Sequence, residues 1–234
     1  MSWLTVFLKS TVGRKFVMAV TGLFLCFFLV MHLAGNLLLY VGGEAYDNYA
    51  HMLHSNEELL LIVEVLLYVA FALHIALAFV TTAQNSSTRR IGYRKNESKR
   101  PDRSFPLIFS ADYTMMLTGL IGLAFLTVHL SDFKFEIWWS DAIAGQTPAE
   151  KAFTILSSSW RQGVYLLGSI ALGIHVSHGL ASACQTIGFN HRKYTPTVKW
   201  LSVLFGVIVA IGFSSFPILV NVPEVFDFIT TPTP

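Results

Sequence analysis

The sequence predicts an all-α fold, an integral membrane bundle of five transmembrane helices that forms one domain over residues 1–234. Hydrophobic residues make up 53% of the chain and charged residues only 13%, and the mean hydropathy is +0.56. Soluble domains carry roughly twice that charged fraction. Five stretches are mainly apolar over about 20 residues, the length that a helix needs to cross a bilayer. Helices are expected there because a helix satisfies its own backbone hydrogen bonds in lipid.

The spans are expected, in chain order, over residues 16–43, 65–88, 113–131, 162–190 and 200–223. The second extends backwards through Glu64 to about Leu59, and the third begins near Phe109. Pro217 lies near the far end of the fifth. No low-complexity linker divides these stretches, so we expect the five helices to pack as one bundle.

The basic residues predict the orientation of the bundle. Thirteen of the 16 Lys and Arg residues lie before the first span, between the second and third, or between the fourth and fifth. Cytoplasmic loops carry this excess, so the N-terminus is expected in the cytoplasm and the C-terminus outside. Seven of the thirteen stand in "RRIGYRKNESKRPDR", residues 89–103, which either sets the topology and contacts lipid head groups or docks a cytoplasmic partner. The net charge of +2 gives no reason to expect nucleic acid as a partner.

Four histidines lie deep in the first four spans, one in each. Ionisable residues inside a membrane are rare and usually functional. The first and third spans run outward, which places His32 and His129 near the outer side. The second and fourth run inward, and His74 and His175 each lie ten residues, or ~15 Å of helix, before a glutamine near the inner end. The histidines are therefore expected as an outer pair, His32 with His129, and an inner pair, His74 with His175.

Two facing histidines at each of two levels suit bis-imidazole ligation of a haem iron, since neutral imidazole binds iron and helix bundles hold such sites in their cores. Zinc would want three or four ligands at one depth and is disfavoured. The histidines could instead bond to neighbouring helices, or form with Glu64 the proton relay of a non-haem transporter. Gly122 and Gly168 each precede a histidine by seven residues and share its helix face, which suits either haem clearance or close helix packing.

Four motifs carry a resemblance to a known family: "GRKFVMAVTGLFLCFFLVMHLAGNL", "LLYVAFALHIALAF", "MLTGLIGLAFLTVHL" and "GIHVSHGLASACQTIGF", one in each of the first four spans. With them, nearly the whole chain resembles the cytochrome b558 membrane subunit of succinate dehydrogenase/fumarate reductase, in its five-helix, dihaem, single-anchor type. The resemblance implies two haem b groups, one held by each histidine pair. It matches His175 to the family's ligand in the fourth span and leaves His178 as an alternative ligand.

The resemblance also implies partners and an activity. The protein would anchor a flavoprotein subunit with FAD and an iron–sulfur subunit on the cytoplasmic face of a bacterial inner membrane. Electrons would pass between succinate or fumarate and a membrane quinone, menaquinone by analogy. The chain would then belong to an enzyme, succinate:quinone oxidoreductase, whose dicarboxylate chemistry lies on a partner subunit. A structural anchor whose partner performs all the chemistry is the remaining alternative.

A quinone site needs a proton-exchanging side chain within hydrogen-bond reach. Glu64, in the outer half of the second span, is the candidate for proton handling, unless it is a protonated or paired structural carboxyl. Further candidates, which solvation alone would also explain, lie in the outer loop before it: Asp47, His51 and His54.

Haem propionates need cationic or hydroxyl partners. Arg161, at the outer start of the fourth span, is expected either to bind the propionates of the outer haem or to anchor its helix at the interface. For the inner haem the available cations are Arg89, Arg90 and Lys193.

Overall fold

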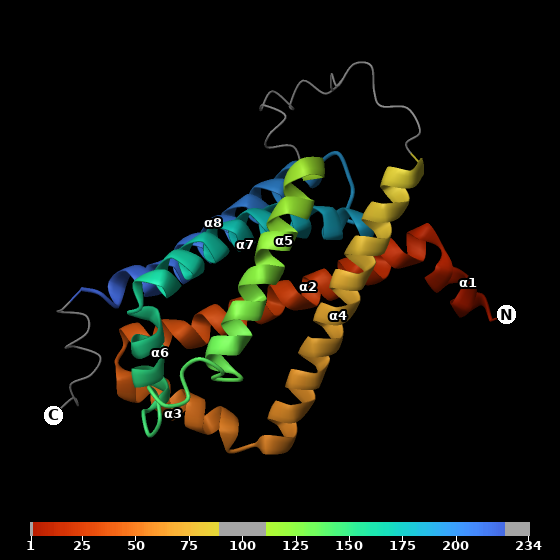
Figure 1. Cartoon of the computed structure of the whole chain (residues 1–234). Coiled ribbons are helices and arrows are strands. Elements are labelled where there is room, and N and C mark those ends of the chain that lie inside the picture. The colour runs from red at the N-terminus through yellow and green to blue at the C-terminus, as the bar shows by residue number, and fades with distance from the viewer. Residues whose placement is uncertain (1, 89–110, 223–234) are drawn as a thin grey trace.

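The computed structural model describes residues 2–88 and 111–222, so the basic cluster at 89–103 lies outside the described part of the chain. Within these two ranges the chain forms helices joined by turns, without a β-strand (Figure 1). Five of the described helices are long and apolar enough to cross a membrane. The predicted all-α bundle of five spans is therefore confirmed, while the orientation of its termini stays a prediction.

The five long helices are α2 (Thr11–Asn36), α4 (Glu57–Thr88), α5 (Ala111–Phe133), α7 (Ser159–Thr186) and α8 (Thr195–Leu219). The first begins before the predicted residue 16 because Ser10 caps it, its Oγ accepting a hydrogen bond from Gly13 N–H at 3.0 Å. It continues as the 3₁₀ helix η1 (Leu37–Tyr40) and stops short of residue 43. The chain turns at Gly42, whose φ of 146° suits glycine far better than a residue with a side chain.

Three short helices complete the fold: α1 (Trp3–Lys9), α3 (Gly43–His54) and α6 (Pro148–Leu156). Helices α3 and α6 come from two different loops and pack against each other at one end of the bundle (Figure 1). Asp47 in α3 joins them, because its Oδ1 accepts a hydrogen bond from Ala149 N–H at 2.8 Å, in the first turn of α6. This contact gives Asp47 a structural role at the helix terminus.

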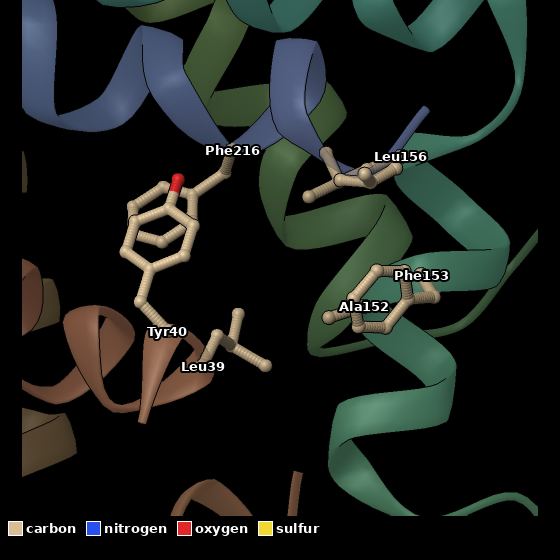
Figure 2. Close-up of a pocket in the computed structure, with 7 residues that line it drawn as sticks. Leu39, Tyr40, Ala152, Phe153, Leu156 and Phe216 are labelled. Atoms are coloured by element: carbon tan, nitrogen blue, oxygen red, sulfur yellow. The ribbon is translucent and has the colours of Figure 1, made fainter. Parts of the chain in front are cut away.

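Residues of η1, α6 and the C-terminal end of α8 meet around a small cavity (Figure 2). Tyr40 stacks on Phe216 with ring centres 5.1 Å apart, and its hydroxyl lies 2.8 Å from Ser215 Oγ. The cavity next to this stack has a volume of about 10 Å³. That is room for about one water molecule, so the cavity does not hold a quinone ring.

The long helices have a defined order of neighbours. Helix α4 packs along α2, α2 along α7, and α7 along both α5 and α8. Helices α7 and α8 approach each other closely at Gly173 and Gly206, where a Cβ on either glycine would collide with the carbonyl oxygen of the other. Small residues permit this close approach in membrane bundles. Helix α8 thus supports α7 from one side, and α2, α4, α5 and α7 carry the four predicted histidines.

Candidate functional site

The structure brings the four histidines together as two pairs. His32 of α2 and His129 of α5 have ring centres 5.8 Å apart, with their planes at 80°. His74 of α4 and His175 of α7 have ring centres 6.5 Å apart, with their planes at 76°. These are the partners that the depth of each histidine in its span predicts. Ligation of haem by them stays a prediction.

The spacing within each pair suits a shared metal ion. Imidazole nitrogen binds a metal at ~2.0–2.1 Å, so two imidazoles on opposite sides of one ion have ring centres about 6 Å apart. Both observed separations, 5.8 and 6.5 Å, lie close to this value. Among the described residues no three His, Cys, Asp or Glu side chains gather closely enough to hold a metal ion. The arrangement therefore suits a cofactor that would take two protein ligands and supply its other ligands itself.

The inner pair shows the hydrogen bonds expected of metal-binding histidines. His74 Nδ1 lies 3.2 Å from the carbonyl oxygen of Met18 and 3.3 Å from Thr21 Oγ1. A carbonyl only accepts, so Nδ1 carries the proton and donates it. The lone pair of Nε2 is then available for a metal. Histidine ligands commonly donate their second ring N–H to a carbonyl or a similar acceptor in this way.

His175 repeats this pattern on the other side of the pair. Its Nδ1 lies 3.3 Å from Thr118 Oγ1. The partner helices are α2 for His74 and α5 for His175. It is His175, and not His178, whose ring faces His74.

A glycine stands against each inner histidine. A Cβ on Gly22 would lie 3.1 Å from Cε1 of His74, and a Cβ on Gly119 would lie 3.3 Å from Cε1 of His175. Both separations are tighter than ordinary van der Waals contact, so a side chain there would press on the ring. The absence of a side chain at Gly22 and Gly119 lets the two imidazole rings lie where they are observed. A flat cofactor bound between the rings would need them in these positions.

The outer pair is surrounded by aromatic rings. Phe28 stacks on His32 at 5.2 Å, and Phe133 and Tyr165 lie 5.3 and 5.9 Å from His129. Nδ1 of His129 is buried and has no hydrogen-bond partner among the described residues. A buried polar nitrogen without a partner is costly, so the ring of His129 has a less complete hydrogen-bond environment than the inner rings. The 5.8 Å spacing and the aromatic surroundings of the outer pair nevertheless fit a flat, metal-bearing cofactor.

The chain is similar to a succinate dehydrogenase cytochrome b558 subunit. That subunit, from Bacillus subtilis (strain 168), is 26% identical to this chain over 212 residues, which cover 86% of this chain and 89% of the relative. No family model and no solved structure matches the chain. The similarity to the cytochrome b558 subunit extends along most of both chains, so it concerns the bundle as a whole.

The glycines chosen by their spacing in the sequence occupy two different environments. A Cβ on Gly122 would meet nothing within 4 Å, so this position is open. A Cβ on Gly168 would collide with the ring of Phe125, so this glycine lets α7 pack against α5. Gly168 thus makes room for a neighbouring aromatic side chain, whereas Gly22 and Gly119, which the spacing did not single out, face the inner histidines.

An internal repeat in the sequence points to Gly22 and Gly119. Helix α2 carries Met18-x-x-Thr21-Gly22-Leu23, with His32 eleven positions after the threonine, and α5 carries the same residue types at the same spacing around Thr118, Gly119 and His129. This internal repeat places a histidine of the outer pair and a Thr-Gly of the inner pair on one helix. Comparison of the spans with one another would have found both glycines and both threonines.

A buried polar cluster lies beside the outer pair, and sequence reasoning missed it as a cluster. Asp132 is fully buried and binds three partners. Its Oδ1 lies 2.9 Å from Arg161 Nη2 and accepts a hydrogen bond from Trp139 Nε1–H at 3.0 Å, while its Oδ2 accepts one from the Tyr165 hydroxyl at 3.0 Å. Arg161, the predicted propionate partner, is therefore bound to Asp132, although its Nε has no partner among the described residues.

The remaining predicted residues have other partners or surroundings. Glu64 forms an ion pair with Lys134, at the end of α5. His54 Nδ1 lies 2.7 Å from the carbonyl oxygen of Ala50, within α3. His51 is exposed in the same helix, and Lys193 lies 5.6 Å from the centre of the Tyr194 ring. Arg89 and Arg90 fall outside the described residues.

Proposed function

We propose that this chain is the membrane-anchoring, dihaem cytochrome b subunit of a bacterial succinate:quinone oxidoreductase. The observation that carries the proposal is the presence of two imidazole pairs, each at the spacing of two ligands on one metal ion, in a bundle of five apolar helices. The similarity to a named succinate dehydrogenase cytochrome b558 subunit supports the same conclusion. Haem b supplies reversible one-electron transfer when it is bound.

The residues of the chain would bind and orient the two haems. His32 and His129 would hold the outer haem, and His74 and His175 the inner one, each histidine pair joining two helices that do not pack directly along each other. The hydrogen bonds at Nδ1 of His74 and His175 orient these rings. The apolar helices around them exclude water, which sets the dielectric environment of the iron.

The proposal includes the partners and the membrane. A flavoprotein subunit with FAD and an iron–sulfur subunit would bind on the cytoplasmic face of the bacterial inner membrane, and menaquinone would exchange electrons with the haems. The dicarboxylate chemistry would lie on the flavoprotein subunit. The basic segment on the expected cytoplasmic side, residues 89–103, offers positive charge for such a partner.

A reduced-minus-oxidised absorption spectrum of the purified protein tests the cofactor. We expect the α-band of low-spin b-type haem, with two haems per chain by the pyridine haemochrome assay. A protein without these bands would contradict the proposal and would favour a proton-coupled transporter that uses the intramembrane histidines and Glu64. A single haem per chain would contradict the dihaem arrangement.

Glu64 is the proposed proton-handling residue for quinone. Glu64→Gln should lower quinone turnover about 100-fold, the scale of general acid–base catalysis, while both haems keep their spectra. Because Glu64 pairs with Lys134, a loss of the ion pair alone must be separated from the loss of the carboxyl. Lys134→Met breaks the same pair and keeps the carboxyl, so its loss of turnover should be much smaller. Equal losses in the two variants, or unchanged turnover in Glu64→Gln, would contradict the role.

A further inference from the structure

Two threonines hold the inner histidines in the same way. Thr21 Oγ1 lies 3.3 Å from His74 Nδ1, and Thr118 Oγ1 lies 3.3 Å from His175 Nδ1. The threonines belong to α2 and α5, and the histidines belong to α4 and α7. Each hydrogen bond therefore crosses from one helix to its neighbour, and both are made by the same pair of residue types.

The threonine hydroxyls are oriented by their own helices. Thr21 Oγ1–H donates to the carbonyl oxygen of Val17 at 2.9 Å, and Thr118 Oγ1–H donates to that of Thr114 at 2.5 Å. A hydroxyl has one proton, so each oxygen presents lone pairs toward the histidine and accepts. This acceptor favours the proton on Nδ1 of both rings, and at His74 the Met18 carbonyl oxygen shares that proton. Nε2 of each ring is left with its lone pair, which is the form that binds a metal.

The sequence repeat shows that this arrangement is built into both halves of the bundle. Thr21 and Thr118 occupy equivalent positions in the two repeats, each eleven residues before a histidine of the outer pair. Helices α2 and α5 thus each supply one ligand to the outer pair and one hydrogen-bond acceptor to the inner pair. A substitution of Thr21 or Thr118 should therefore change the inner site, although its own helix carries a histidine of the outer pair.

One ring of the outer pair differs from the inner rings in this respect. Nδ1 of His129 has no hydrogen-bond partner among the described residues, whereas Nδ1 of His74 and Nδ1 of His175 each have a threonine hydroxyl within 3.3 Å. An acceptor at Nδ1 makes the imidazole a stronger electron donor to its metal. Stronger donation favours ferric over ferrous iron, and hydrogen bonding around the ligands is one of the means by which a protein sets a haem potential.

We propose that Thr21 and Thr118 are positioning residues that fix the orientation and tautomer of His74 and His175 and thereby lower the potential of the inner haem. The proposal rests on the proposed dihaem function. Neither threonine is a proposed haem ligand, and each should change the midpoint potential of the inner haem only. The chemistry involved is acceptance of a hydrogen bond by a neutral hydroxyl, and it needs no ion or co-reactant.

A redox titration of the membrane-embedded complex tests the proposal. Thr21→Val and Thr118→Val keep the branched shape and remove the acceptor. Each should shift the ferric-to-ferrous preference of the inner haem about tenfold, the lower end of the effect of such supporting partners, which raises its midpoint potential by about 59 mV for a one-electron couple. The potential of the outer haem should stay unchanged. The inner haem is identified as the component that is lost in His74→Ala.

Thr127→Val is the matched control. Thr127 lies on α5, and its exposed hydroxyl donates to the carbonyl oxygen of Leu123 at 3.0 Å without contacting a histidine. This variant should leave both potentials unchanged, and Thr21→Ser, which restores the hydroxyl, should return the inner potential toward that of the unmodified protein. Valine variants whose potentials match those of Thr127→Val, or whose shift falls on the outer haem, would overturn the proposal.

Two further comparisons keep the test decisive. If the valine variants do not assemble, Thr21→Ala and Thr21→Ser differ only in the hydroxyl, and equal inner-haem potentials in these two would overturn the proposal. Failure of the dihaem function itself is recognised separately, because the unmodified protein would then lack two b-type haems. Two haems in the unmodified protein with no response to the threonine variants would leave the function standing and remove this inference alone.

Discussion

We expect His175→Ala to remove one of the two proposed haems and to leave the other in place, and His74→Ala to remove the same one. This is the expected result because the two rings face each other with centres 6.5 Å apart, about the separation of two imidazoles on one metal ion. Loss of either ring would leave that ion with a single protein ligand in an apolar bundle. His32→Ala and His129→Ala should remove the other haem, since their rings form the second pair at 5.8 Å.

The measurement is the number of haems per chain in each variant, together with the α-band that remains. His178→Ala is the matched control, because this histidine stands one helical turn after His175 in α7 and does not make the ring contact with His74. Both haems should persist in this variant. Loss of the inner haem in His178→Ala, or loss patterns that join His74 to His129, would contradict the assignment of ligands.

The pairing of the histidines could be predicted from the sequence because it depends on quantities that are local to each helix. The direction of a span and the number of residues from its polar end give the depth of His32 or His74, at a rise of ~1.5 Å per residue. Depth leaves few choices when each of the first four spans carries one deep histidine. The five spans were predictable for a similar reason, since hydropathy over about 20 residues needs no knowledge of the neighbours.

The contacts between helices could not be predicted in this way. Spacing along α7 places Gly168 on the face of His175, but only the packing of α5 shows that Phe125 occupies the space beside that glycine. The partners of Thr21 likewise depend on the angle and register between α2 and α4, which single-helix periodicity does not contain. The internal repeat was the one feature of the sequence that indicated the importance of Thr21 and Thr118.

Asp132 shows the same limit for charged residues. In the sequence, Asp132 stands next to the end of an apolar span, which suggests a carboxylate in contact with solvent. Trp139 follows in the outer segment, which suggests a side chain at the membrane interface. In the structure Asp132 is fully buried, and Trp139 donates its indole N–H to the Asp132 carboxylate. Arg161 and Tyr165 reach the same carboxylate from α7, and this long-range convergence becomes visible only once the helices are assembled.

Asp132→Ala should destabilise the protein by about 3–5 kcal/mol, because it removes one partner of a buried ion pair. Arg161 is only 13% exposed, and its guanidinium would be left without its carboxylate. The Tyr165 hydroxyl and the Trp139 indole would each lose their acceptor as well. A buried donor without a partner adds its own desolvation cost. The midpoint of unfolding of the detergent-solubilised protein measures this loss.

Glu136→Ala is the matched control for Asp132→Ala. Glu136 also pairs with a basic residue, Lys151, at 2.7 Å, but these side chains are 37% and 32% exposed. An exposed pair contributes at most about 1 kcal/mol, so the control should unfold close to the unmodified protein. Equal destabilisation in the two variants would show that burial of the Asp132 cluster does not set its contribution.

The effect of Asp132→Ala should also fall unequally on the two haems. Tyr165, which donates to Asp132, has its ring centre 5.9 Å from that of His129, and Asp132 follows His129 by three residues on α5. Release of Tyr165 and Arg161 therefore loosens the surroundings of the outer pair, whereas the inner pair is held by Thr21 and Thr118. The α-band of the outer haem should shift or weaken at temperatures where that of the inner haem is still intact. A variant in which both haems respond together would show that the cluster supports the whole bundle and not the outer site.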